Sequence, residues 1–470
     1  MISFNLDLKV IKNLLFFFLL GCLIRIIPDI IAYPYPIGYD IINYYIPLAE
    51  KIDTIFPNDS FQFYPYLLYI FNSFIPLNPQ GLMVSLSSIT YGIFSISIYL
   101  LLKGLNLKPA LFMIIFILFQ ISVLRTTWDL EKDVLSLSFT FLIFYLILED
   151  QKYFFSKRRR IIHFSTIISL VILTLLTDNM IALLLIISLS IYFLIKKDIK
   201  YIISLTIIII SIISFLLVVV DNTKNDQLIN SINHILTGNI KENENYSALN
   251  LGILFIMMNI LSFPLFIYGL KYLHELLLYI PLSISLLGSF TWIVLPYSAI
   301  LLPDRWIIIC GVFMSIFSSY GLIKLSSNNK DKPNYKIISP IISFYILIGF
   351  FYMILPYDYA FPIYGIFAEY THFFVPSTMQ FNSIDIVDNR DLSIVIDWLN
   401  HHTNPKSIIY GDSYLSGWMK ILLKDKRIFQ YNDAKSASNG IHITLANKID
   451  SINEPKKLLF SQGNFRIIEN

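Results

Sequence analysis

Charged residues are scarce in this sequence. They make up 14% of its 470 residues, whereas an average soluble domain has about 25%. Hydrophobic residues account for 56%, and the mean hydropathy is +0.65. These values exclude an ordinary water-soluble protein. The net charge of only +3 comes from short basic clusters between apolar stretches. Such clusters favour topology signals over a nucleic-acid-binding surface, so no nucleic-acid partner is expected.

Cysteine is also rare, and several common catalytic motifs are missing. The two cysteines, Cys22 and Cys310, both fall in apolar stretches, which excludes a disulfide framework and a cysteine-based zinc site. The sequence has no phosphate-binding P-loop, dinucleotide-binding glycine pattern, nucleophile elbow or HExxH zinc motif. Any chemistry must therefore come from acids and bases in the few polar segments.

Long hydrophobic runs are abundant instead. A bilayer core about 30 Å thick takes roughly 20 apolar residues per helix. By this measure the sequence predicts a polytopic α-helical membrane protein with about eleven transmembrane helices. The first run is expected to remain as a helix, because no signal-peptide cleavage site follows it. The expected spans are about 11–32, 81–102, 109–125, 134–148, 161–177, 180–195, 201–220, 249–270, 276–301, 306–323 and 336–355.

The charges between these runs predict the orientation. Basic loops alternate with acidic ones, and the basic loops are expected in the cytoplasm. The N-terminus of this cell-membrane protein is then cytoplasmic, and Asp40, Asp129, Glu131 and Asp304 lie on the outer side. Residues 61–77 are short, aromatic and interrupted by proline, so an interfacial helix is expected there. If they crossed the membrane instead, every later loop would change sides.

The composition changes near residue 377. Residues 1–376 are predicted to form the transmembrane domain, in which residues 33–80 make a structured first outer loop with interfacial helices. Residues 377–470 are polar and mixed, and they predict a small extracytoplasmic α/β domain. Helices are expected at 393–401 and 413–423, and strands at 407–410, 427–431, 441–445 and 465–468.

Asp40 is the first candidate for chemistry. It follows the first span, beside Gly38 and Tyr39 and shortly before Tyr44 and Tyr45. An outer-face carboxylate next to a membrane groove can act as a general base toward an acceptor hydroxyl. The neighbouring tyrosines could stack on a sugar ring or a prenyl chain. The structural alternative is that Asp40 caps the helix that follows it.

A second polar cluster falls between the third and fourth expected spans. It contains Arg125, Asp129 and Glu131 in what is expected to be a short outer turn. Two acids two residues apart in an extended loop can point into one cavity, where they would bind substrate or a divalent cation such as Mg²⁺ or Mn²⁺. The alternative is that these charges only solvate the loop and cap the next helix.

A third cluster, Asp304 and Arg305, opens the tenth expected span. A guanidinium there is placed to bind a lipid phosphate, because arginine matches phosphate oxygens in a bidentate manner. The alternative is an interfacial ion pair with Trp306 as a membrane anchor. Arg25 and Asp29 lie one turn apart on the first helix and are expected to pair with each other.

Together these features resemble the GT-C superfamily of integral membrane glycosyltransferases, which includes protein O-mannosyltransferases, arabinosyltransferases and the catalytic subunit of oligosaccharyltransferase. The resemblance rests on three segments. They are Gly38-Tyr39-Asp40 in a long first outer loop, Asp129-Leu130-Glu131 in the second, and Asp304-Arg305 at the start of a late span. An outer C-terminal domain completes the pattern.

The resemblance implies a polyprenyl-phosphate-linked sugar donor, with Asp40 as the catalytic carboxylate. Asp129 and Glu131 match the family's second-loop acidic pair, and Arg305 matches a phosphate-binding residue. Ile42 stands where some members have a second acid, so metal dependence is left open. The WWD-type signature of oligosaccharyltransferase is absent from residues 377–470, which speaks against that subunit.

We therefore expect transfer of a sugar from a lipid-linked donor, in contact with membrane lipids, to a glycan, lipid or protein acceptor. Asp40 would be the base. The expected substrate-binding residues are Tyr39, Arg125, Asp129, Glu131, Asp304 and Arg305. Two alternatives stand beside this reading. A transporter or flippase would bury ionisable groups near the membrane midplane, and a non-catalytic scaffold would need only one anchoring helix.

Overall fold

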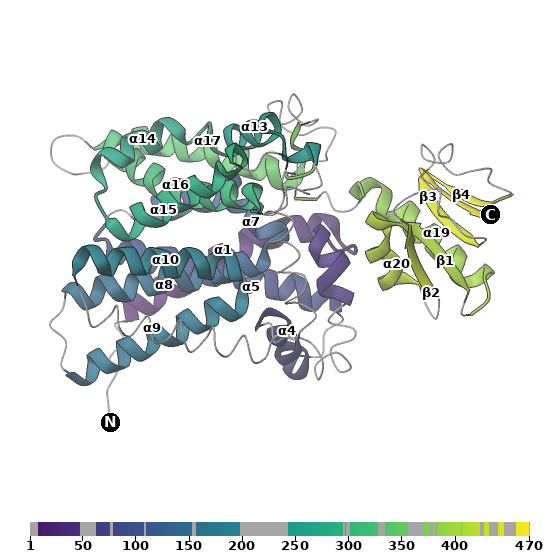
Figure 1. The fold of residues 1–470 in the computed structure, drawn as a ribbon, viewed down its shortest axis with the longest axis horizontal. Helices are drawn as coiled ribbons and strands as arrows, with labels where there is room; N and C mark the ends of the chain where they lie inside the picture. Colours follow the sequence, from purple (N-terminus) through teal and green to yellow (C-terminus); the bar gives the residue numbers. More distant parts are fainter. Residues whose placement is uncertain are drawn as a thin grey trace.

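The computed structural model places a helical bundle beside a small C-terminal sheet, with the two chain termini at opposite ends of the molecule (Figure 1). It describes residues 8–47, 63–75, 79–107, 110–152, 157–197, 243–294, 297, 301–327, 334–355, 370–375, 379–380, 384–405, 407–423, 427–431, 440–445 and 457–469.

The helical membrane character expected from the sequence is confirmed. Six helices in the described part of the chain are long and apolar enough to cross a membrane, or eight spans if each of two bent pairs counts as one. The bundle helices are α1 (Leu8–Ala32), α5 (Pro79–Gly104), α6 (Ala110–Leu118), α7 (Ile121–Asp129), α8 (Glu131–Lys152), α9 (Lys157–Thr177), α10 (Asn179–Lys196), α13 (Ala248–Asn259), α14 (Phe263–Tyr272), α15 (Leu276–Ser289), α16 (Pro303–Ser326) and α17 (Tyr335–Ile354). The span expected at 201–220 lies outside the described residues.

Two of the expected spans are broken. α6 and α7 meet at an angle of 60°, and α13 and α14 meet at 71°. A third, expected over 276–301, is helical only to Ser289 and continues as a 3-10 turn at Thr291–Ile293. Hydropathy does not reveal these breaks, because the apolar run continues through them.

Helix α16 forms the centre of the bundle. In its most apolar stretch 89% of the residues are buried inside the protein. Small residues let its neighbours approach closely, since a side chain at Gly269 of α14 would overlap the backbone of Phe317 in α16. Close backbone approach through small residues is typical of helix pairs in membranes. The charged residues at the start of α16 are thereby fixed relative to the other helices.

Helix α4 and the Asp40 turn bear on whether residues 61–77 cross the membrane. Helix α4 (Phe63–Phe74) has 12 residues, and at 1.5 Å per residue its length of about 18 Å is short of a membrane core. The backbone amide of Asp40 also contacts the Asp129 carboxylate. If residues 61–77 had crossed the membrane, Asp40 and Asp129 would lie on opposite sides. Both observations argue against a crossing by α4, and its place at the membrane interface stays a prediction.

The C-terminal region combines helices with a mixed β-sheet, as expected from the sequence. Helix α19 (Asn389–His402) precedes β1 (Ile408–Asp412), a 3-10 turn (Ser413–Leu415), α20 (Ser416–Leu422), β2 (Arg427–Tyr431), β3 (Ile441–Leu445), β4 (Lys457–Gln462) and β5 (Phe465–Glu469). The strand order is β2-β1-β3-β5-β4. The first three strands are parallel, and β5 pairs antiparallel with β3 and β4. Strand β4 was not expected, although Gly463-Asn464 between two apolar runs is a hairpin signal.

Candidate active site

The loop that carries Asp40 lies against the C-terminal end of α7. Gly38 has a φ of +94°, and a Cβ there would come within 2.8 Å of the Trp128 carbonyl oxygen and 3.2 Å of Asp129 Oδ1. Only glycine meets both demands without strain. The Asp40 backbone N–H then donates a long hydrogen bond of 3.4 Å to Asp129 Oδ1. Gly38 thus allows the backbone of this loop to pack against the end of α7, which places Asp40 beside Asp129.

The Asp40 side chain has no structural partner among the described residues. It precedes the π-helical turn Ile41–Tyr45, yet it makes no side-chain cap to that turn. The capping alternative is therefore wrong. The carboxylate is half-buried. Burial raises the pKa of Asp40 above its ordinary value, while the positive charges of Arg305, Arg125 and Lys132 oppose that rise.

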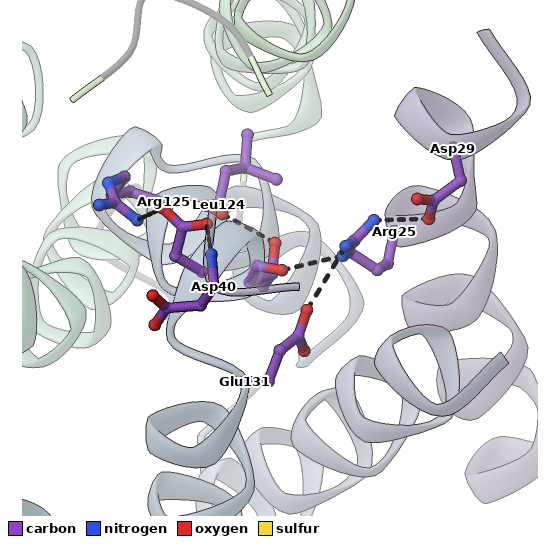
Figure 2. Close-up of polar contacts among 8 residues, drawn as sticks. Arg25, Asp29, Asp40, Leu124, Arg125 and Glu131 are labelled. Carbon is purple, nitrogen blue, oxygen red and sulfur yellow. Dashed lines mark hydrogen bonds and ion pairs between the residues drawn. The ribbon is translucent and has the colours of Figure 1, made fainter. Parts of the chain in front are cut away.

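Arg125 and Asp129 contribute to this site from α7. They lie one turn apart on α7, and Arg125 Nη1 is 3.6 Å from Asp129 Oδ2. Arg125 Nε donates to the Phe374 carbonyl at 2.8 Å, and its guanidinium lies 4.7 Å from the Trp128 ring centroid. These contacts hold one guanidinium beside the Asp40 loop. Figure 2 shows Asp40 and Arg125 on the same side of the cluster.

Arg305 enters the site from the first turn of α16. Its guanidinium is within electrostatic reach of Asp40 and Asp304, and of Asp133 and Asp178 on neighbouring helices. It makes no ion pair with any described residue. A half-buried guanidinium without a close partner among the described residues has donors available for an anion. The sequence-predicted residues Tyr39, Asp40, Arg125, Asp129, Asp304 and Arg305 are thus brought together.

Three further residues belong to the surroundings of Arg305. Asp133 is buried near Asp178, and neither of its carboxylate oxygens has a hydrogen-bond partner among the described residues. Asp178 caps α10 by accepting from the Ile181 amide at 2.9 Å. Burial raises the pKa of Tyr246 to about 12, so its hydroxyl stays protonated near Asp304 and Arg305. The sequence analysis did not choose these residues for the site. Their only local signals are a helix start at Asp178 and the position of Asp133 beside Glu131.

Glu131 lies in a different network, together with Arg25. Arg25 Nη1 is 2.6 Å from Asp29 Oδ2, which confirms the expected pair, and its Nη2 is 3.4 Å from Glu131 Oε1. Arg25 Nε also donates to the Thr127 carbonyl at 2.9 Å. Arg25 and Glu131 are each 1% exposed. In Figure 2 Glu131 points toward Arg25 and away from Arg125.

The expectation of an extended acidic loop is wrong. Helix α7 continues through Asp129, and α8 begins at Glu131, so only Leu130 separates the two helices. The two carboxylates face different arginines instead of sharing one cavity. Among the described residues, no group of three His, Cys, Asp or Glu side chains is arranged to hold a metal ion. A divalent cation on Asp129 and Glu131 stays a prediction.

The arrangement suits an acid–base reaction on an anionic substrate. A half-buried carboxylate without a structural partner can accept a proton. Two guanidinium groups beside it can stabilise negative charge that develops on a phosphate. The tyrosines at one end, Tyr39 and Tyr44, are 37% and 60% exposed, and their ring centroids are 6.5 Å apart. They leave an aromatic surface beside the carboxylate.

No protein-family model matches the chain, and no curated protein matches it in sequence. Solved structures do match. The helical bundle with its C-terminal sheet has the fold of these structures, in agreement with the GT-C fold expected from the sequence. At the low sequence identity found, the likeness shows the fold and not the activity.

Two of the matching structures are of ArnT. The crystal structure of ArnT from Cupriavidus metallidurans bound to undecaprenyl phosphate has a TM-score of 0.57 at 11% identity, covering 97% of this chain and 98% of that one. The apo structure of the same protein has a TM-score of 0.57 at 10% identity, covering 98% of each chain. The likeness therefore extends over both the bundle and the C-terminal sheet.

Proposed function

We propose that this protein is a membrane glycosyltransferase that moves a sugar from a polyprenyl-phosphate-linked donor to an acceptor at the Asp40 end of the bundle. The observation that carries the proposal is the Asp40 carboxylate, which has no structural partner among the described residues and lies near Arg125 and Arg305. The shared fold with ArnT, whose structure holds undecaprenyl phosphate, supports a lipid phosphate as the carrier. The sugar and the acceptor, a glycan, a lipid or a protein, are left open.

The proposed reaction is an inverting displacement. Asp40 removes the proton from an acceptor hydroxyl as the oxygen attacks the anomeric carbon of the donor sugar. The bond between that carbon and the phosphate oxygen breaks, and the lipid phosphate leaves with the electron pair. Arg305, with Arg125 beside it, stabilises the charge on the departing phosphate. The Tyr39 and Tyr44 rings are placed to stack on the sugar.

The proposal also concerns placement in the membrane. We propose that the Asp40 end faces outward, as the basic loops predict, with residues 1–376 as the transmembrane domain and residues 377–470 as an outer domain. A reporter fused between α8 and α9, next to the basic residues Lys157–Arg160 at the start of α9, would test the orientation. Reporter activity on the cytoplasmic side is expected, and activity outside would overturn the assignment.

The direct experiment replaces Asp40 by asparagine, which keeps the shape and removes the base. Membranes containing each variant would be supplied with labelled polyprenyl-phosphate sugars. Transfer is expected to fall by about 10²- to 10⁴-fold, the usual contribution of a general base. The matched control is Asp397→Asn, because Asp397 is exposed and, among the described residues, pairs only with the exposed His401. Transfer by Asp40→Asn at the level of the control would refute the role of Asp40.

The bent helices favour a second candidate function. Interrupted membrane helices form the substrate sites of many transporters, and two such breaks are present here. However, the breaks at residues 119–120 and 260–262 contain no charged side chain. Reconstituted vesicles with a fluorescent polyprenyl phosphate would separate the two functions. Protein-dependent exchange of the lipid between leaflets, without sugar transfer, would support the transporter.

A further inference from the structure

The segment that carries Asp40 is held between the membrane bundle and the C-terminal sheet region. Ile41, Tyr45 and Ile46 are buried in a cluster with residues of α4 and α5. Ile42, between them, is buried in the core of the C-terminal region, among residues of α19, α20 and the sheet. Ile421 of α20 packs against both clusters. Adjacent residues of one short turn thus belong to two different cores.

The turn itself has an unusual geometry. Residues Ile41–Tyr45 form a π-helical turn, and all of them except Tyr44 are buried. Turns of this kind are rare, and those that occur are frequently found at functional sites. An unusual backbone conformation persists only when the surrounding contacts stabilise it. Here the fixing contacts are needed next to Asp40, whose carboxylate is not itself held by any described side chain.

Asn43 links this turn to α20. Its Nδ2 donates to the Tyr39 carbonyl at 3.0 Å, immediately before Asp40. Its Oδ1 accepts from the Gly417 backbone N–H at 3.0 Å and from the Ser416 hydroxyl at 3.4 Å. One buried side chain therefore connects the backbone beside Asp40 to the start of α20, which lies 374 residues further along the chain.

Gly417 is required for this contact. A Cβ at that position would lie 2.5 Å from Asn43 Oδ1, 2.8 Å from the Ile42 carbonyl oxygen and 2.9 Å from Asn43 Cα. Two of these are main-chain atoms, which cannot rotate away. Nearby, the rings of Trp418 and Tyr35 meet edge to face with centroids 6.3 Å apart. The two surfaces are therefore in direct backbone contact.

We propose that the C-terminal region is a positioning element of the active site, and that Asn43 and Gly417 are positioning residues that fix Asp40 through the Tyr39 carbonyl. The region then acts on the base and is more than an attached outer module. The kinetic part of this inference rests on the proposed transfer reaction. The arginines lie on α7 and α16, whereas the hydrogen bonds of Asn43 run to Tyr39, Ser416 and Gly417. Loss of these hydrogen bonds therefore displaces the base and spares the phosphate site.

The test uses the full-length protein and two independent readouts. Gly417→Ala is expected to lower kcat by about tenfold or more while the KM for the donor changes by less than about twofold. Hydrogen exchange of the peptide covering residues 39–47, measured by mass spectrometry, is expected to become faster. If Gly417→Ala fails to fold, Asn43→Ala takes its place, since it removes the same hydrogen bonds without a clash.

Two controls are available in the chain. Gly252→Ala makes the same chemical change where no atom lies within 4 Å of the added Cβ, and Lys420→Ala alters an exposed residue of α20 itself. Both are expected to match the wild type. Unchanged exchange in residues 39–47 of Gly417→Ala or Asn43→Ala would overturn the inference, as would a loss confined to KM. If no variant, including the wild type, transfers sugar, the proposed reaction fails, and the exchange measurement still decides whether the tie exists.

Discussion

Two arginine networks lie at the same end of this protein, and they differ in how completely they are satisfied. Arg25 uses its guanidinium on Asp29, Glu131 and the Thr127 carbonyl, and it is almost fully buried. Arg305 is surrounded by four acids but makes no close ion pair with a described residue. We call the Arg25 network closed, because the guanidinium is paired within the protein, and the Arg305 network open, because its guanidinium keeps donors available for a ligand.

The difference separates a structural role from a binding role for the same residue types. A buried charge must be paired, because an unpaired one is costly to remove from water. Arg25 meets that requirement entirely within the protein and joins α1 to the α7–α8 junction. Arg305 lacks such a close partner among the described residues, so an anionic ligand would supply one. The same contrast holds for the acids. Glu131 is paired with Arg25, whereas the Asp40 carboxylate has no partner in the part of the chain that the structure describes.

The largest expected effect would come from breaking the closed network. Arg25→Met leaves Asp29 and Glu131 buried without their partner, which should cost about 3–5 kcal/mol of unfolding free energy. Thermal unfolding in detergent would measure the loss. Arg305→Met is the matched comparison and should change stability by about 1 kcal/mol or less. Equal losses of stability in the two variants would contradict the distinction between the networks.

A smaller effect is expected from removing the free guanidinium. Arg305→Met should weaken donor binding by about 1.5–3 kcal/mol, the usual value of hydrogen bonds to a charged group. Arg305→Lys should fall between, because lysine keeps the charge but not the planar fork. Binding of the polyprenyl phosphate alone, followed by fluorescence or calorimetry, would report it. Unchanged affinity in Arg305→Met would remove Arg305 from the phosphate site.

The attachment of the Asp40 loop to α7 can be tested at Gly38. Alanine at this position must adopt a φ of +94° and approach the Trp128 carbonyl, which should cost about 1–2 kcal/mol in strain or displace the loop. We expect kcat to fall while the melting temperature changes little. Gly252→Ala is again the control. A normal kcat for Gly38→Ala would show that the position of this loop does not limit transfer.

The smallest expected effect is a shift in the pH dependence of transfer between the wild type and Arg305→Met. Burial raises the pKa of Asp40, and the base form exists only above that pKa. Transfer should therefore fail on acidification at a pH above the ordinary carboxylate value of about 3.9. Arg305 opposes the rise, so Arg305→Met should move the acid limb of kcat/KM to still higher pH. A shift to lower pH would contradict the proximity of Arg305 to Asp40.

The sequence predicted the local features of the fold well. Apolar runs located the membrane helices. The helical spacing of apolar residues predicted α19, and short apolar segments predicted β1, β2, β3 and β5. The Arg25–Asp29 pair was predictable because its members lie one helical turn apart. By contrast, the bends between α6 and α7 and between α13 and α14 depend on how neighbouring helices pack, which an unbroken apolar run does not reveal.

The sequence selected the candidate residues of the site but did not reveal their contacts. The contact between Arg25 and Glu131 joins residues 106 apart, and that between Asn43 and Gly417 joins residues 374 apart. Neither has a local signal in one sequence. The short spacing of Asp129 and Glu131 suggested a shared cavity, but the junction of two helices at Leu130 turns their carboxylates toward different arginines.

The most direct test of the account compares Asp40→Asn with Glu131→Gln, measuring both transfer per folded molecule and melting temperature. We predict that Asp40→Asn keeps the wild-type melting temperature and loses about 10²- to 10⁴-fold of its transfer rate. Glu131→Gln should melt at a lower temperature and retain its transfer rate per folded molecule. The reverse outcome, with an active Asp40→Asn and a stable but inactive Glu131→Gln, would contradict the account.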